Sequence, residues 1–199
     1  MLLNLHIKRR KAMKRKFGFI TFVTVFVLSS FMTEMNFYTV EAKTLTNLSK
    51  FVPSTTSNLI GAEAAKADTD LTLADMLTYA IQDEYLAKAK YSLVVEKFGQ
   101  QRPFINIISA EVTHINALTP LFTKYNVALP EDNSKNYIKT PTSIKESLEN
   151  GVKGEIENIA MYERFLKQDI PSDVKTVFTR LRNASQNHLQ AFQRALSSY

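Results

Sequence analysis

The chain has 199 residues, a length that allows one domain of ordinary size together with a terminal segment. It contains no cysteine, which excludes disulfide scaffolds, iron–sulfur clusters, thiolate metal sites and cysteine nucleophiles. The net charge of +6 comes from the N-terminus, because residues 1–42 hold seven of the 25 basic residues but only two of the 19 acidic ones. Since the rest of the chain is nearly neutral, the charge pattern predicts no nucleic-acid partner.

Residues 1–42 have the layout of a secretory signal peptide. A basic run ends at Lys16, an apolar run follows, and Val40-Glu41-Ala42 offers a cleavage site. Met13 offers a second start of translation with its own basic region. The apolar run has about 16 residues, fewer than the roughly 20 that span a bilayer comfortably. We therefore expect a secreted or cell-envelope protein, with an uncleaved N-terminal membrane anchor as the alternative.

Residues 43–70 read as a flexible linker. They are rich in Ser, Thr, Asn and Ala and have no sustained hydrophobic period, apart from one short helix expected near residues 60–66.

Residues 71–199 predict four helices and no strand, because no alternating apolar run is bounded by hairpin turns. The first helix opens with the capping pattern Thr72-x-x-Asp75 and stops at Gly99, a residue typical of helix C-termini. Proline residues or a Ser-x-x-Glu pattern open the other three. The expected ranges are 72–98, 103–125, 143–168 and 172–198.

Each predicted helix carries one face that is apolar at both ends and polar in the middle. Four such faces would enclose a common core, which predicts an all-α fold, an antiparallel four-helix bundle over residues 71–199. The connection 126–141 is long enough to cross the whole bundle, although simple up-down packing also fits. The central polar positions on the four faces are Glu84, Glu111, His114, Glu155, Asn158, Ser185 and His188.

This layer would bring three carboxylates together with two imidazoles and no Lys or Arg. Buried carboxylates normally protonate or find a cation, so one or two divalent metal ions would resolve the charge. The expected ligands are Glu84, Glu111, His114, Glu155 and His188. Iron is the favoured metal, and manganese and zinc are also suited to these ligands. A metal-free hydrogen-bonded network is the alternative.

The pattern resembles the ferritin-like superfamily. Glu111-x-x-His114 with Glu84 looks like half of a ferritin-like di-metal site, and Glu155 with His188 looks like the other half. The segments AIQDEYLAKAKY, AEVTHINALTPLFTKY, IAMYERFL and ASQNHLQAF resemble a family of uncharacterised prokaryotic ferritin-like domains. The Glu-x6-Tyr spacing, similar to that of ferritins and rubrerythrins, places Tyr91 and Tyr162 as residues that orient the ligands.

The sequence departs from this family pattern at two positions. Ser185 stands where a Glu would precede His188 by three residues, and Asn158 stands where rubrerythrins often carry another Glu. Five ligands therefore remain, with Ser185, Asn158 or water completing a weakened second metal position. The resemblance implies a ferroxidase-like or peroxidase-like oxidoreductase that uses oxygen or peroxide, and assembly into a homo-oligomer is open. A non-catalytic, metal-free cell-envelope bundle is the alternative.

Overall fold

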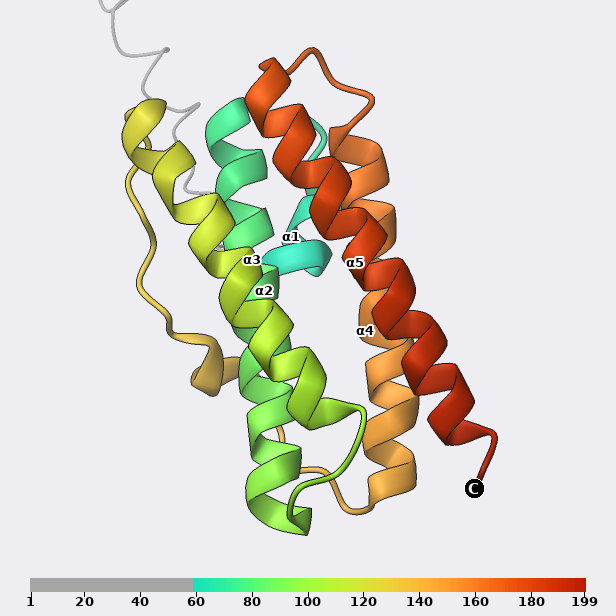
Figure 1. Ribbon diagram of the computed structural model, residues 1–199. Coiled ribbons are helices and arrows are strands. Elements are labelled where there is room, and N and C mark those ends of the chain that lie inside the picture. The colour runs from blue at the N-terminus through green and yellow to red at the C-terminus, as the bar shows by residue number, and fades with distance from the viewer. Residues whose placement is uncertain (1–58) are drawn as a thin grey trace, which may run out of the picture. The chain divides into compact units, whose positions relative to one another are not determined.

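The computed structural model describes residues 59–199 and contains, within them, five α-helices and no strand (Figure 1). The predicted signal peptide, residues 1–42, lies outside the described residues. None of the helices described is long and apolar enough to cross a membrane. The elements in chain order are α1 (Gly61–Ala67), α2 (Leu73–Phe98), α3 (Phe104–Lys124), the 3-10 helix η2 (Ser134–Tyr137), α4 (Ile144–Phe165) and α5 (Ser172–Leu196).

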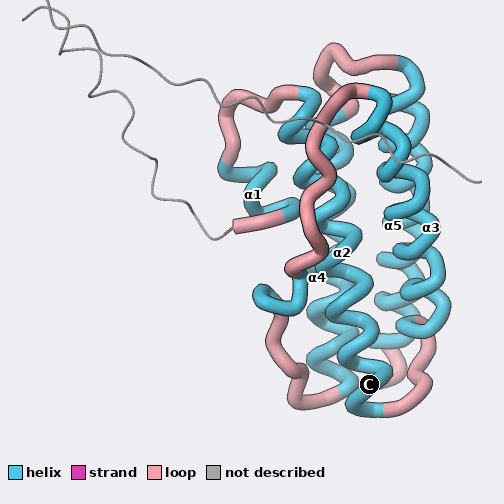
Figure 2. The backbone as a smooth tube through the Cα atoms, turned by 90° about the vertical axis from the view of Figure 1, so that its left-hand side faces the viewer, coloured by secondary structure: helices cyan, strands magenta, loops and turns pink. Residues whose placement is uncertain are grey.

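The four long helices, α2 to α5, lie side by side (Figures 1 and 2). Helices α2 and α3 form one antiparallel hairpin, α4 and α5 form the other, and the hairpins meet through α2 with α4 and α3 with α5. The connection from α3 to α4 runs back along the length of the helices and packs η2 against α2. As a result, α3 and α4 run in the same direction.

The ends of the long helices follow the local signals in the sequence. The capping box is present, because the amide of Asp75 donates to the hydroxyl of Thr72 and the amide of Thr72 donates to the carboxylate of Asp75. Helix α2 ends at Gly99, whose φ of +80° lies in the region that favours glycine. Helix α4 is capped by Ser143, which accepts a hydrogen bond from the amide of Glu146 at 3.1 Å.

Helix α1 lies within residues 43–70, the segment predicted as a linker. The short helix expected near residues 60–66 is present, but it packs against α2 and α4 and buries Ala62 and Ala65. The amide of Ala62 donates to the carboxylate of Asp83 at 2.8 Å, and the guanidinium of Arg164 donates to the carbonyl of Ala65. This docking could not be predicted from the sequence, because alanine side chains are small and produce only a weak hydrophobic period.

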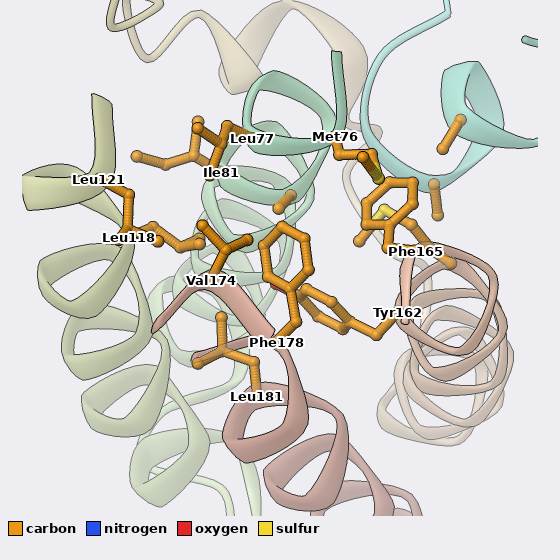
Figure 3. Packing of buried hydrophobic residues seen from close by; sticks show 14 of the residues in the cluster. Met76, Leu77, Ile81, Leu118, Leu121, Tyr162, Phe165, Val174, Phe178 and Leu181 are labelled. Atoms are coloured by element: carbon orange, nitrogen blue, oxygen red, sulfur yellow. The ribbon is translucent and has the colours of Figure 1, made fainter. Parts of the chain in front are cut away.

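The apolar core is divided into two clusters by the central polar layer. One cluster, shown in Figure 3, lies toward the N-terminus of α2 and combines side chains from α2, α3, α4 and α5, among them Leu77, Leu118, Tyr162 and Phe178. The other cluster lies toward the C-terminus of α2 and includes Tyr91, Val94, Phe104, Ile107, Leu148 and Phe192. The predicted apolar-polar-apolar faces are therefore buried as expected.

Candidate metal centre

The polar layer between the two apolar clusters brings together side chains from all four long helices. Glu84 comes from α2, Glu111 and His114 from α3, Glu155 from α4, and His188 from α5. All five are buried, with between 1% and 9% of their surface exposed. Because they are buried, these residues are not solvated surface residues of their helices.

The first half of the centre is formed by Glu84, Glu111 and His114. The Nδ1 atom of His114 lies 2.9 Å from Oε2 of Glu84 and 3.0 Å from Oε2 of Glu111. These three residues offer ligand atoms that all lie within 4.8 Å of one another. Such a convergence of one imidazole and two carboxylates is a donor set for a divalent metal ion.

The second half is formed by Glu111, Glu155 and His188, whose ligand atoms also lie within 4.8 Å of one another. The Nδ1 atom of His188 is 3.3 Å from Oε1 of Glu111 and 3.6 Å from Oε1 of Glu155. Neither contact has hydrogen-bond geometry, so this buried nitrogen has no hydrogen-bond partner among the described residues. Both carboxylates nevertheless lie within ion-pair distance, so this nitrogen faces two negative charges without a hydrogen bond to either, a position that a metal ion can also fill.

Glu111 belongs to both halves. Its Oε2 faces His114 and its Oε1 faces His188, while the two imidazole rings stack with centroids 5.5 Å apart. A carboxylate that turns one oxygen toward each of two donor sets has the arrangement of a bridging ligand.

Two tyrosines hold the outer carboxylates in place. The hydroxyl of Tyr162 donates to Oε1 of Glu84 at 2.7 Å, and that of Tyr91 donates to Oε1 of Glu155 at 2.8 Å. Each tyrosine hydroxyl is therefore hydrogen-bonded to the carboxylate of a candidate ligand. Burial raises the pKa of both hydroxyls well above the ordinary value, with a further contribution from the neighbouring carboxylates, so both stay protonated donors.

The two positions that depart from the family pattern are hydrogen-bonded to each other. The hydroxyl of Ser185 donates to the side-chain oxygen of Asn158 at 2.8 Å. The amide nitrogen of Asn158 donates to Asp83 at 2.8 Å and lies 3.4 Å from Glu84. Ser185 and Asn158 thus lie beside the centre, although neither belongs to the two groups of candidate ligands.

Asp83 is the residue at this site that the sequence analysis did not single out. Burial raises its pKa to about 6, although hydrogen bonds from Ala62 and Asn158 act in the opposite direction. Its position next to Glu84 turns it about 100° around the helix, away from the predicted face. The sequence could not indicate that Asp83 accepts hydrogen bonds from Ala62 and Asn158, because the contact with Ala62 forms only when α1 packs against α2.

The carboxylates and imidazoles of the centre shift one another's pKa values. Burial alone would lower the pKa of His114, but hydrogen bonds with Glu111 and Glu84 raise it to about 10. Burial opposes a similar rise for His188, where the carboxylates of Glu111 and Glu155 bring the pKa to about 9. Burial and the charge of Glu111 raise the pKa of Glu84 to about 7. The imidazoles therefore act as the cations that the carboxylates require, a role that a metal ion can take over.

The chain matches a known protein family across all four long helices. The family described as "Uncharacterized protein domain (DUF2202)" matches residues 73–198. The uncharacterized protein MJ0754 of Methanocaldococcus jannaschii is 30% identical over 133 residues, which cover 59% of this chain and 71% of the relative. A crystal structure of hypothetical protein MJ0754 from Methanococcus jannaschii DSM 2661 is similar with a TM-score of 0.59 and 27% identity, covering 66% of this chain and 85% of that one. The chain therefore belongs to the DUF2202 family.

Proposed function

We propose that this chain is an exported, ferritin-like four-helix-bundle protein that binds one or two metal ions, with iron preferred, between its four long helices. The observation that carries the proposal is the carboxylate of Glu111, which contributes to two groups of candidate ligands at once. The Nδ1 of His188 beside it, which forms no hydrogen bond with the two carboxylates that face it, supports the same proposal. Export is proposed from the signal-like layout of residues 1–42.

The course of the chain supports the ferritin-like assignment. Two antiparallel hairpins are joined by a connection that runs back along the helices, as in ferritin-like folds with one long crossover. The side chains also follow the arrangement of a carboxylate-bridged centre, with one Glu from each of α2 and α4 and a Glu-x-x-His pair on α3. Only α5 departs from it, through Ser185.

The five candidate ligands would be shared between two metal ions. Glu84 and His114 would hold one ion, Glu155 and His188 the other, and Glu111 would connect them. Bound iron supplies one-electron chemistry with oxygen or peroxide as the oxidant. The three carboxylates would compensate the charge of the ions, and the hydroxyls of Tyr91 and Tyr162 would keep the outer two carboxylates oriented.

Metal analysis of the purified full-length chain tests the proposal. We expect about one or two iron, manganese or zinc ions per chain after metal loading and removal of excess, and at least tenfold weaker binding in Glu111→Ala and His114→Ala. Glu149→Ala, at an exposed glutamate of α4, is the matched control and should bind like the wild type. Circular dichroism shows whether each variant is folded. A wild-type chain that binds no metal and melts at the same temperature with and without iron contradicts the proposal.

Turnover is tested separately. We expect the full-length chain to oxidise added ferrous iron with oxygen or peroxide faster than a buffer blank, and Glu111→Ala to lose this acceleration. Rates equal to the blank would restrict the function to metal binding.

A second candidate rests on the hydrogen bonds of the metal-free centre. His114 contacts both Glu84 and Glu111 at hydrogen-bond distance, so protonated imidazoles can satisfy these carboxylates without a metal. The chain would then be a non-catalytic cell-envelope protein whose polar layer fixes the register of the helices. Metal analysis distinguishes the two, because this candidate predicts no bound metal.

A further inference from the structure

A cavity of about 140 Å³ lies against the candidate metal centre and is bordered by α1, α2, α3, η2 and α4. We call it the entrance cavity. Its lining includes Tyr91 together with Glu111 and Glu155, the two carboxylates that face the Nδ1 of His188 without forming a hydrogen bond to it. Its volume has room for a few water molecules. The cavity therefore places solvent-sized space directly beside two candidate ligands.

The titratable side chains of the entrance cavity are mostly acidic. Five carboxylates line it against one ammonium group, that of Lys90. Glu63 on α1 is exposed and Glu157 on α4 is partly exposed, whereas Glu111 and Glu155 are buried. Carboxylates thus extend from solvent to the centre. A concave surface lined by one sign of charge raises the local concentration of the opposite ion.

A second cavity of about 200 Å³ adjoins the first on the side of Pro141. The two share several lining residues, including Glu63, Lys90, Gly154 and Glu157. Gly154 therefore lies on the wall of both. A Cβ atom placed there would have Tyr91 Oη as its nearest neighbour, at 3.9 Å, so the wall accepts an alanine without a clash. A longer side chain would project into the space that Gly154 leaves open.

We infer that divalent cations reach the candidate metal centre through the entrance cavity, that Glu63 and Glu157 attract them at its mouth, and that the absence of a side chain at Gly154 keeps it open. This inference rests on the proposed metal binding and adds the route of the ion and the residues that control its rate. Lys90 on the wall opposes the attraction, as does Lys153, whose Nζ lies 3.8 Å from Oε1 of Glu157.

The test is the rate at which Co²⁺ binds to the metal-free full-length chain, followed by stopped-flow absorbance. At low salt, we expect the double variant Glu63→Gln/Glu157→Gln to bind about three- to tenfold more slowly, with the same final number of Co²⁺ ions. The difference should shrink in high salt, because added ions screen exposed charges. The matched control Glu96→Gln/Glu149→Gln removes two exposed carboxylates of α2 and α4 that do not line the cavity, and should keep the wild-type rate.

A second pair of variants tests the width of the route without changing charge. Gly154→Leu should slow Co²⁺ binding at least tenfold and leave the final amplitude unchanged, whereas Gly154→Ala should bind at a rate close to the wild type. Circular dichroism checks that Gly154→Leu is folded. If this variant does not fold, the charge variants still test the route. Lys90→Gln should change the rate in the opposite direction and accelerate binding.

The outcomes separate this inference from the proposed function. If the wild type binds Co²⁺ and the charge and size variants all bind at its rate, the route is wrong while metal binding stands. That result would favour a path between α3 and α5, where the side chains of His114 and His188 keep 9% and 11% exposure. If the wild type binds no Co²⁺ and no other metal, the proposed function fails and the route fails with it.

Discussion

The hydroxyl of Ser185 on α5 donates a hydrogen bond to the side-chain oxygen of Asn158 on α4, at 2.8 Å. Ser185 stands where the ferritin-like pattern would have a Glu three residues before His188, and Asn158 stands where rubrerythrins often carry another Glu. The side-chain nitrogen of Asn158 donates a hydrogen bond to Asp83, which also accepts one from the amide of Ala62 at the start of α1. A neutral, hydrogen-bonded pair therefore lies beside the centre and connects it, through Asp83, to the helix that borders the entrance cavity.

The variant Ser185→Glu should restore the missing ligand. The new carboxylate would share the buried face of α5 with His188, and we expect at least tenfold tighter binding of a second metal ion, measured by titration with Co²⁺ or Fe²⁺. The metal-free variant should be less stable, because another buried carboxylate lacks a cation. Ser185→Gln has nearly the same shape without the charge and serves as the control. Equal metal binding by both variants would show that this position does not supply a ligand.

The hydroxyls of the two tyrosines should matter for metal affinity more than for folding. Tyr162→Phe and Tyr91→Phe keep the ring but remove the donor to Glu84 and Glu155, respectively. We expect each to weaken metal binding about 10-fold, as loss of a group that orients a ligand typically does. Tyr79→Phe is the matched control, since its hydroxyl donates to Asp68 away from the centre. An unchanged dissociation constant in the first two variants would contradict the orienting role.

The metal-free chain should lose stability as the pH rises from about 6.5 to about 10. The pKa values of His114 and His188 in the folded protein are about 10 and about 9, above the ordinary value of 6.5. The folded state therefore binds more protons than the unfolded state in this range, so their stabilisation is complete below pH 6.5 and is lost through the folded pKa values. Urea titrations at several pH values measure the free energy of unfolding. In His114→Gln this free energy should depend less on pH.

The affinity for metal should change with pH in the opposite direction to the stability of the metal-free chain. Because a bound ion replaces protons on the imidazoles, metal affinity should rise with pH over the same range. Calorimetry in buffers of different ionisation enthalpy measures the number of protons released. Binding without proton release would contradict the assignment of His114 and His188 as ligands.

Two glycines of α4, three residues apart, should respond in opposite ways to alanine. A Cβ at Gly151 would lie 2.9 Å from the buried ring of Phe192, so Gly151→Ala must push α4 and α5 apart. We expect a net loss of about 1–2 kcal/mol in the free energy of unfolding, because overpacking exceeds the gain in helix propensity. Gly154→Ala meets no such contact and should gain roughly 0.5–1 kcal/mol. Denaturant unfolding of both variants measures these changes. Equal changes in the free energy of unfolding would contradict the close approach at Gly151.

The long helices and the membership of the polar layer could be predicted from the sequence because both depend on local order. Capping residues such as Thr72 and Ser143 act on amides three residues away, and the spacing of apolar residues fixes which side of a helix is buried. Glu84 and His188 could therefore be assigned to one layer although more than a hundred residues separate them.

Tertiary structure alone decided how these groups meet. The orientation of the two oxygens of Glu111, the lack of a hydrogen bond at His188 Nδ1 and the crossing of the α3–α4 connection depend on how helices pack against one another. The docking of α1 and the contacts of Asp83 were missed for the same reason, since a short alanine-rich segment and a carboxylate off the main face acquire their roles only by packing together. Periodicity specifies which face of a helix is buried, whereas the partner of each side chain on that face is set by contacts between distant segments.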